Sequence, residues 1–292
     1  MRLKAENSLA RLSSVWSAVA VMAAFRRCGS PEGPWVLGAS LRKQVYATYP
    51  HPLLHPPKVL TLYVLGPNGK RDRSVPSVID GTLGDADAVF ELMRYYLLRL
   101  GGHKAVDVTL VADGAKWIWN RGEELREALG LPPDRFHEIV DYFHAVERLG
   151  DFARSRADWD EAYRREWLAL QKKRLKAGEI EEIESVLRVI AKGRGAELDT
   201  EREYWKRNRE RLRFAAFRQA GLPNGSGAVE SSVRRVVNLR LKGASITWTQ
   251  ERAEAVLHLR SYAKSGRWDE LQEAALRETR WRPTTRQPAK AA

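Results

Sequence analysis

Residues 106–120 read VDVTLVADGAKWIWN, a mostly apolar run that ends at an aspartate and a glycine. The run up to Ala112 is typical of a buried strand. Asp113-Gly114 is typical of the turn that follows a strand, where an aspartate is often only a turn former. The pattern therefore places the carboxylate of Asp113 at the carboxyl end of a strand and leaves its role, structural or chemical, open.

The segments around this strand predict an α/β sheet with an antiparallel start and a parallel continuation. Apolar and β-branched runs indicate strands, a Pro-Asn-Gly triplet indicates a hairpin, and apolar residues at helical spacing indicate helices. The predicted elements are strands at 59–65, 73–79, 106–112 and 136–140, a hairpin turn at 67–69, and helices at 85–100 and 123–129. From 142 to 220 the chain is highly charged and is predicted to be helical, with solvated faces.

A second carboxylate lies in residues 225–235, GSGAVESSVRR, near the start of a predicted basic helix. Ser226 or Asn224 can cap that helix, which puts Glu230 about one turn inside it. Arg234 follows one turn later on the same face, and a valine stripe (Val229, Val233, Val236) would anchor the helix to the sheet. Without other information, a capped surface helix with an internal ion pair explains this segment best.

A third segment, residues 140–149, reads VDYFHAVERL and carries Asp141 and His144 just after a predicted strand. Their spacing lets both side chains project from one helical turn. One interpretation is an auxiliary group beside a reacting phosphate, with the histidine as proton carrier. The alternative, a helix cap plus a histidine satisfied by its neighbours, is equally well supported.

Taken together, the three motifs resemble those of the ISKra-type transposases of bacterial insertion sequences, which are relatives of the mutator-like DDE transposases. The resemblance extends over about residues 57–270 and is more specific than any single motif. It implies an RNase H-like mixed sheet with a large all-helical insertion before the final catalytic helix. It also implies cleavage and strand transfer of DNA at terminal inverted repeats and target sites, by at least a homodimer.

The resemblance makes Asp113 and Glu230 the expected catalytic metal ligands, for Mg²⁺ or Mn²⁺. Two-metal phosphoryl transfer needs carboxylates that converge on ions roughly 4 Å apart, and hard oxygen ligands suit Mg²⁺. Asp141 and His144 become candidate auxiliary catalytic residues. Gly114 and Gly227 would let a DNA backbone approach closely.

The family's first aspartate is missing from its expected place. It belongs to an Asp-Gly motif upstream of the region matched by residues 58–65, whereas this sequence has no aspartate before Asp72. Asp80, in Ile79-Asp80-Gly81-Thr82, is the only replacement the sequence offers, and a turn-forming role explains it better. We therefore expect a chain of transposase ancestry, truncated or frame-shifted, that holds two of three catalytic carboxylates.

The charge balance points to an anionic partner. The chain carries 50 Lys and Arg against 37 Asp and Glu, a net charge of +13. Residues 231–292 alone hold 13 basic and 6 acidic side chains, a net of +7. Basic side chains that neutralise phosphates give salt-sensitive nucleic-acid affinity, although net charge alone is also compatible with a merely soluble surface. The expected DNA contacts are Arg234, Arg235, Arg240 and Lys242.

The N-terminal segment 1–57 is expected to be irregular or non-homologous, because glycine and proline interrupt it repeatedly. Its apolar run at 15–25 imitates a signal peptide, but Arg26 and Arg27 follow at once without a small-residue cleavage pattern. The run is shorter than the roughly 20 residues that span a bilayer. We interpret it as a cytoplasmic segment that could form an amphipathic helix. The lone Cys28 excludes an intramolecular disulfide and fits a reducing cytoplasm. A DNA-acting protein of the kind that the resemblance implies is expected to associate with the nucleoid and to have no membrane partner.

The remaining expected divisions are the first part of the core (58–149), the helical insertion (150–222), the second part with basic helices (223–275) and a flexible tail (276–292).

Two other functions compete with an active transposase: a catalytically inactive DNA-binding remnant, and an unrelated basic α/β nuclease. The first would bind DNA without metal-dependent cleavage, and the second would cleave without strand transfer. Trp117 and Trp119 are either core residues or a stacking surface for an unpaired base, with at least one expected in the core.

Overall fold

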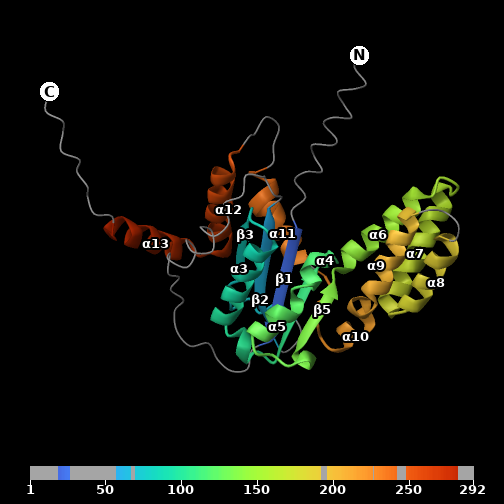
Figure 1. Ribbon diagram of the computed structural model, residues 1–292, viewed down its shortest axis with the longest axis horizontal. Helices are drawn as coiled ribbons and strands as arrows, with labels where there is room; N and C mark the ends of the chain where they lie inside the picture. The colour runs from blue at the N-terminus through green and yellow to red at the C-terminus, as the bar shows by residue number, and fades with distance from the viewer. Residues whose placement is uncertain are drawn as a thin grey trace, which may run out of the picture.

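The computed structural model describes residues 19–26, 57–66, 70–191, 196–225, 227–241 and 248–281 of the 292-residue chain. It is a mixed α/β structure in which helices outnumber strands (Figure 1). One five-stranded sheet lies at the centre, the helices α6–α9 form a block on one side of it, and α13 extends away on the other side (Figure 1).

The sheet has the strand order β3-β2-β1-β4-β5. Its strands are β1 (Val19–Arg26), β2 (Lys58–Leu65), β3 (Val78–Thr82), β4 (Asp107–Ala112) and β5 (Phe136–Val140). β2 and β3 pair antiparallel and β4 and β5 pair parallel, which confirms the predicted antiparallel start and parallel continuation. The expected strand at 73–79 is displaced, because the chain joins β2 only through a bridge between Leu65 and Arg71 before β3 begins at Val78. The predicted hairpin turn at 67–69 lies outside the described residues.

The central strand is the main departure from the prediction. Val19–Arg26 forms β1, so the expectation of an irregular segment with an amphipathic helix was wrong for these residues. β1 runs parallel to β2 and antiparallel to β4, with Val21 opposite Ala112 and Arg26 opposite Asp107. A short apolar run does not distinguish helix from strand by periodicity alone, and here two neighbouring strands supply hydrogen-bond partners on both edges.

The helices follow the predicted pattern closely. They are α3 (Ala86–Arg99), α4 (Lys116–Trp119), α5 (Gly122–Ala128), α6 (Tyr142–Ser155), α7 (Glu161–Ala177), α8 (Ile180–Ala191), α9 (Ala196–Arg207), α10 (Phe214–Gln219), α11 (Gly227–Val233), α12 (Gln250–Ser265) and α13 (Trp268–Trp281). Short 3₁₀ turns occur at Gly102–Lys104, Pro133–Arg135 and Arg209–Leu212, and a π-helical segment, η5 (Arg234–Asn238), continues α11. Helices α6–α10 occupy the chain between β5 and α11, as predicted.

Side-chain oxygens at helix starts account for several of these boundaries. Asp85, Asp160 and Thr249 accept hydrogen bonds from backbone amides in the first turns of α3, α7 and α12, which satisfies donors that have no partner inside a helix. Gly178 and Gly266 end α7 and α12 in the left-handed conformation that glycine adopts without strain. The sequence therefore encodes these helices locally as well as through burial.

Two apolar cores hold the elements together. The larger core joins β2, β4 and β5 to α3, α5 and the helical block, with members such as Leu62, Leu92 and Trp205. The smaller core joins Val59 and Ile79 to Val236 and Leu257, and so fixes η5 and α12 against β2 and β3. Within the described ranges, no helix combines the length and apolar character needed to cross a membrane.

Candidate active site

Three of the sequence motifs meet at one end of the sheet. β4 and β5 are parallel, so Asp113 and Asp141 follow their strands at the same edge. The Asp141 amide donates to the Ala112 carbonyl at 2.7 Å, and the Tyr142 amide donates to the carbonyl of Asn224 at 3.0 Å. These bonds bring the segment before α11 to the ends of β4 and β5, and the first turn of α11 carries Glu230.

Asp113 is half-buried and closes its own turn. Its Oδ1 accepts a hydrogen bond from the Ala115 amide at 2.9 Å, an Asx turn of the kind that the turn-former interpretation predicts. This bond uses one carboxylate oxygen and leaves Oδ2 without a bond in the described part of the chain. Asp113 can therefore be both a turn former and a ligand.

Gly114 has a different role from the one predicted. Its φ is +87°, and a Cβ built there would lie 2.5 Å from the hydroxyl oxygen of Tyr204. That hydroxyl donates to the Asp113 carbonyl at 3.3 Å. The space beside Gly114 is thus filled by a tyrosine of the helical block, so the expected close approach of a DNA backbone at this glycine is not supported. Gly227, by contrast, has open space beside it.

A cavity of about 560 Å³ opens beside Asp113. Its wall comes from the turn after β4, from α6 and from α9, and includes Asp113, Lys116, His144, Arg148, Glu203, Tyr204 and Arg207. Three basic side chains and two carboxylates line the cavity, and one of the basic side chains, Arg148, already pairs with Glu201, so the charge of the wall is close to balanced.

Tyr204 and Arg148 form the rigid part of that wall. The Arg148 guanidinium lies 3.9 Å from the centre of the Tyr204 ring and also pairs with Glu201. Burial raises the pKa of Tyr204 well above its usual value, an effect larger than the opposing influence of Arg148. The tyrosine therefore remains a neutral hydrogen-bond donor at physiological pH.

Asp141 is a helix cap, and His144 faces the cavity. Asp141 is 3% exposed, and its Oδ1 accepts from the amides of Phe143 and His144 at 2.7 and 3.1 Å. The His144 side chain is 35% exposed, with Nδ1 3.6 Å from Glu147. The cap interpretation is thus confirmed for Asp141, whereas His144 lines the same cavity as Asp113, where an imidazole can exchange a proton with a bound group.

Glu230 is exposed on α11 and forms no ion pair with Arg234 in the described part of the chain, so the expected internal pair is absent there. Val229 and Val236 are fully buried, which confirms the predicted anchoring stripe. Glu230 does not line the cavity that contains Asp113. The two carboxylates are brought to one end of the sheet but not into one cavity.

The cap of α11 and the basic residues that follow it are only partly described. Asn224 Nδ2 donates to the Phe214 carbonyl, and Ser226 lies outside the described residues. Arg234 and Arg240 are exposed and Arg235 is half-buried, while Lys242 is also outside the described residues. The exposed arginines are available to an anionic partner.

The π-helical segment η5 follows α11 directly and begins four positions after Glu230. π-helical segments are rare in proteins, and those that do occur often lie at functional sites. Arg260 of α12 donates from Nε to the Val236 carbonyl at 2.9 Å and from Nη2 to the Arg235 carbonyl. Burial lowers the pKa of Arg260, with a smaller contribution from Arg240. The arginine binds carbonyl oxygens at the irregular segment and holds it against α12.

Asp80 lies in the interior of β3 and not in the candidate site. It is fully buried, accepts from the Tyr96 hydroxyl at 2.5 Å and from the Gly81 amide at 2.9 Å, and has His258 Nδ1 at 3.6 Å. β2 and β1 separate β3 from β4, which places the two strands about 14 Å apart. Asp80 is therefore not positioned to replace a missing metal ligand next to Asp113.

Of the two tryptophans after Asp113, Trp119 belongs to the core. It is 7% exposed, and the Arg211 guanidinium lies 4.8 Å from its ring centre. Trp117 is half-buried and packs edge-on against Phe90 at 6.2 Å between ring centres. The expectation that at least one of the pair is a core residue is confirmed.

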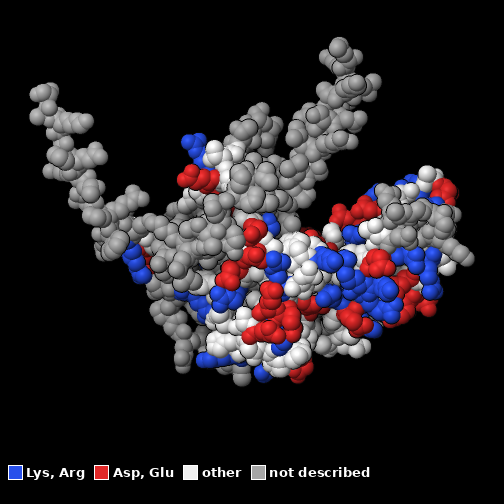
Figure 2. All heavy atoms as spheres, viewed as in Figure 1, with Lys and Arg blue, Asp and Glu red and all other residues white. Residues whose placement is uncertain are grey.

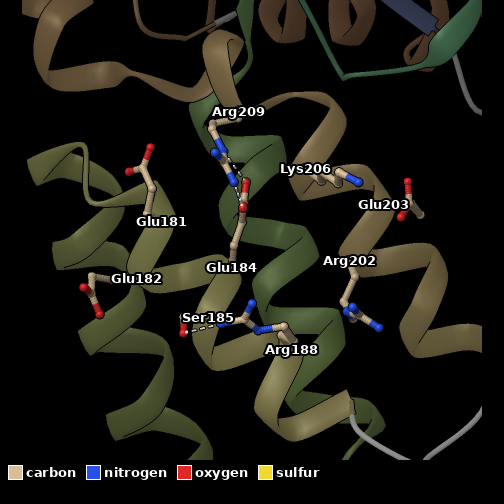
Figure 3. Close-up of a pocket in the computed structure, with 9 residues that line it drawn as sticks. All are labelled: Glu181, Glu182, Glu184, Ser185, Arg188, Arg202, Glu203, Lys206 and Arg209. Carbon is tan, nitrogen blue, oxygen red and sulfur yellow. Dashed lines mark hydrogen bonds and ion pairs between the residues drawn. The ribbon is translucent and has the colours of Figure 1, made fainter.

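Another hollow, of about 510 Å³, lies within the helical block (Figure 3). Its wall carries four glutamates and four basic residues: Glu181, Glu182, Glu184, Glu203, Arg188, Arg202, Lys206 and Arg209. The Arg209 and Glu184 side chains face each other and form a two-bond ion pair (Figure 3). The balanced charges indicate solvated helix faces, as predicted for this block, and not a selective site.

Sequence patterns did not identify Tyr204, Arg148 and Arg207 as neighbours of Asp113. Tyr204 is 91 positions away in the chain, and no local motif marks it. Comparisons with protein-family models, with curated proteins and with solved structures found no match. The chemistry of this site therefore rests on its residues and their geometry.

Proposed function

We propose that the chain is a DNA-binding protein of the DDE transposase type whose set of catalytic carboxylates is incomplete. The observation that carries this proposal is the meeting of Asp113, the Asp141–His144 turn and the start of α11 at one end of the sheet. These are the motifs on which the resemblance to ISKra-type transposases depends.

The arrangement of elements supports the same proposal. An RNase H-like core with a helical insertion is expected to place helices between its last strand and the helix that carries the final glutamate. Here α6–α10 lie between β5 and α11, and α11 packs on β1 and β2. We therefore propose that the sheet and its helices form an RNase H-like core.

The described residues at this end do not form a complete two-metal site, because Glu230 does not line the cavity that contains Asp113, whereas Asp113 keeps a free oxygen that would hold a Mg²⁺ or Mn²⁺. Asp113 Oδ2 and the exposed Glu230 are hard oxygen donors, and Mg²⁺ keeps several waters and needs only one or two carboxylates. Asp141 is buried as a helix cap. When bound, such an ion would polarise a phosphodiester toward attack; His144 would carry a proton and Arg148 with Lys116 would hold the anionic group.

The sequence of the central strand β1 supports a catalytically inactive DNA-binding remnant over an active transposase. The resemblance expects the first aspartate on the first strand, upstream of the region matched by residues 58–65. That place is filled by β1, VAVMAAFR, which contains no carboxylate and runs antiparallel to β4. Loss of one metal-binding carboxylate is expected to abolish or cripple strand transfer.

The distribution of charge supports DNA as the partner. Figure 2 shows Lys and Arg gathered over the helical block on this face, with carboxylates between them, whereas acidic side chains dominate around α5. These residues, and separately the exposed Arg234 and Arg240 of η5 and the turn after it, are available to phosphates.

The test is cleavage of a labelled duplex that carries the DNA flanking the coding sequence, with Mg²⁺ or Mn²⁺. The full chain is compared with Asp113→Asn and Glu230→Gln. We expect duplex binding by all three proteins and no metal-dependent cleavage by any. Cleavage that disappears in both variants would establish a complete active site and overturn the inactive form. Absence of duplex binding would overturn the proposal as a whole.

A further inference from the structure

A separate polar cavity of about 300 Å³ lies on the opposite part of the sheet from Asp113. It is enclosed by β2, the segment leading into β3, α11 with η5, and the C-terminal end of α12. Its wall includes Thr61, Arg71, Ser77, Ser231, Arg235 and Lys264. Neither Asp113 nor the proposed metal ligand Glu230 belongs to this wall.

Three cationic side chains line the cavity, and no carboxylate is among the described lining residues. Arg71, Arg235 and Lys264 form no ion pair within the described ranges. Arg235 uses only Nε, which donates to the Ser231 carbonyl at 3.1 Å. Its terminal nitrogens remain available, so the cavity holds uncompensated positive charge from three separate elements.

Lys264 has an ordinary alternative role in the last turn of α12, where a cation offsets the helix dipole. However, the end of that helix is already capped: the Gly266 amide donates to the Ala263 carbonyl and the Arg267 amide to the Tyr262 carbonyl. The dipole also does not explain Arg71 and Arg235, which come from other segments. Three full charges outweigh the partial negative charge of one helix end.

Two buried hydroxyls in the same wall have no hydrogen-bond partner within the described part of the chain. Thr61 is 2% exposed and Ser77 is 8% exposed, and neither Oγ1 of Thr61 nor Oγ of Ser77 is bonded. The large majority of buried side-chain hydroxyls in folded proteins are paired. Their position in a cationic cavity indicates donors that await an acceptor.

We propose that this cavity binds a phosphate group. A phosphate oxygen accepts hydrogen bonds from hydroxyls and arginines, and its negative charge matches the three cations. The volume of about 300 Å³ is ample for a phosphate group. The phosphate could belong to a DNA backbone or be free in solution. The site stands on its own residues, so it does not require the chain to be a transposase.

The first experiment measures thermal stabilisation and binding heat of the full chain with inorganic phosphate at constant ionic strength. Wild-type protein is compared with Thr61→Val and Arg71→Gln. The matched controls are Thr109→Val, which removes another buried hydroxyl without a bond but far from the cavity, and Arg73→Gln, which removes a neighbouring exposed charge. We expect Arg71→Gln to weaken phosphate binding about tenfold, Thr61→Val to weaken it less, and the controls to leave it unchanged.

A duplex DNA arm identifies the source of the phosphate. If the backbone occupies the cavity, Arg71→Gln lowers duplex affinity more than Arg73→Gln and phosphate competes with the duplex. If a free phosphate is the occupant, the variants change only phosphate binding. Absence of phosphate binding by the wild-type protein, or equal losses in Arg71→Gln and Arg73→Gln, would overturn the proposal. If the protein fails to bind phosphate in this cavity but still binds the duplex, the phosphate proposal is wrong and the proposed DNA-binding function stands. The two proposals can therefore fail separately.

Discussion

At the residue scale, Gly114 joins the sheet to the helical block. Its left-handed backbone and its missing side chain let the Tyr204 ring pack against the turn after β4. The same tyrosine bonds the Asp113 carbonyl. The orientation of the candidate ligand Asp113 thus depends on a contact with α9.

Replacing Gly114 with alanine is expected to destabilise the protein more than the same change at Gly101. Both glycines have a φ near +80°, at +87° and +80°, but only Gly114 has atoms within 4 Å of the added Cβ. The shared backbone strain costs about 1 kcal/mol, and the overlap with Tyr204 adds about 1–3 kcal/mol. Urea unfolding measures both variants. Equal losses would show that Tyr204 does not occupy the space beside Gly114.

Asp80 is part of a buried charged network rather than a catalytic site. Arg267 is 8% exposed and donates to the Tyr96 hydroxyl at 3.3 Å, and Tyr96 donates to Asp80. Burial opposes the charge of Arg267, but Tyr96 and Asp80 more than offset that effect and leave its pKa above the usual value. Glu254 and Asp80 lie on either side of the His258 ring, at 3.2 and 3.6 Å.

Removal of Asp80 should therefore be costly for stability. Asp80→Ala removes the buried carboxylate that accepts from Tyr96 and faces His258, and it leaves Glu270 as the one carboxylate paired with Arg267 in the described part of the chain, for which we expect a loss of about 3 kcal/mol. Asp151→Ala is the matched control, because Asp151 pairs with Arg154 while both are about two-thirds exposed, and such pairs contribute about 0.5 kcal/mol or less. Chemical denaturation compares the two. A loss as small as the control's would contradict the network.

Sequence patterns identified the local roles of Asp113 and Asp141 but not the role of Asp80. Asp113 and Asp141 were recognisable as turn and cap residues because both roles depend on amides two or three positions away. The partners of Asp80 lie 16 to 178 positions away along the chain, at Tyr96 and His258. No local pattern encodes such contacts, so Asp80 could not be assigned to a network from sequence.

At the element scale, α12 connects the C-terminal region to the sheet edge. Leu257 is fully buried in the smaller core with Val59, Ile79 and Val236. Ser265, at the end of the helix, accepts from the Ile79 amide at 2.8 Å. The helix therefore contributes both apolar packing and a polar bond to the edge strand β3.

Leu257→Ala should cost about 2–5 kcal/mol, because it leaves a cavity in that core. Leu259 lies on the same helix and is 45% exposed, so Leu259→Ala should cost well under half of that amount. Circular dichroism during urea unfolding measures the difference. Similar losses at the two positions would mean that α12 does not pack on β3 through Leu257.

Strands with neighbours in sequence were predicted better than the strand without them. β2, β4 and β5 were recognisable from their apolar runs and the turns that bound them. β1 was misread because its placement depends on hydrogen bonding to β2 and β4, which begin 32 and 81 residues after Arg26. Strand direction in particular is a tertiary property.

At the scale of the whole molecule, the net positive charge and the proposed phosphate cavity point to the same kind of partner, a polyanion. The cavity beside Asp113 and the cavity beside Arg71 lie at different parts of the sheet. Arg234 and Arg240 are exposed on the segment after Glu230. A duplex that binds this chain is expected to contact several such groups and to release counter-ions from each.

Arg234→Gln should weaken duplex binding uniformly across sequences and lower the slope of log affinity against log salt by about 1. Arg135 is an exposed arginine on the turn before β5, so Arg135→Gln is the matched charge control and should leave the slope unchanged. Fluorescence anisotropy at several salt concentrations gives both slopes. An equal change in the two variants would indicate attraction to net charge without a defined surface.

The most direct test of the central claim is the affinity of the full chain for a labelled flanking-DNA duplex across a salt series, with Mg²⁺ present and the DNA analysed for cleavage in the same samples. We predict binding that weakens steeply with salt, by about 10³-fold or more between about 50 and 200 mM, and intact DNA throughout. Salt-insensitive or absent binding would contradict a DNA-binding protein. Mg²⁺-dependent cleavage lost in Glu230→Gln would contradict an incomplete carboxylate set.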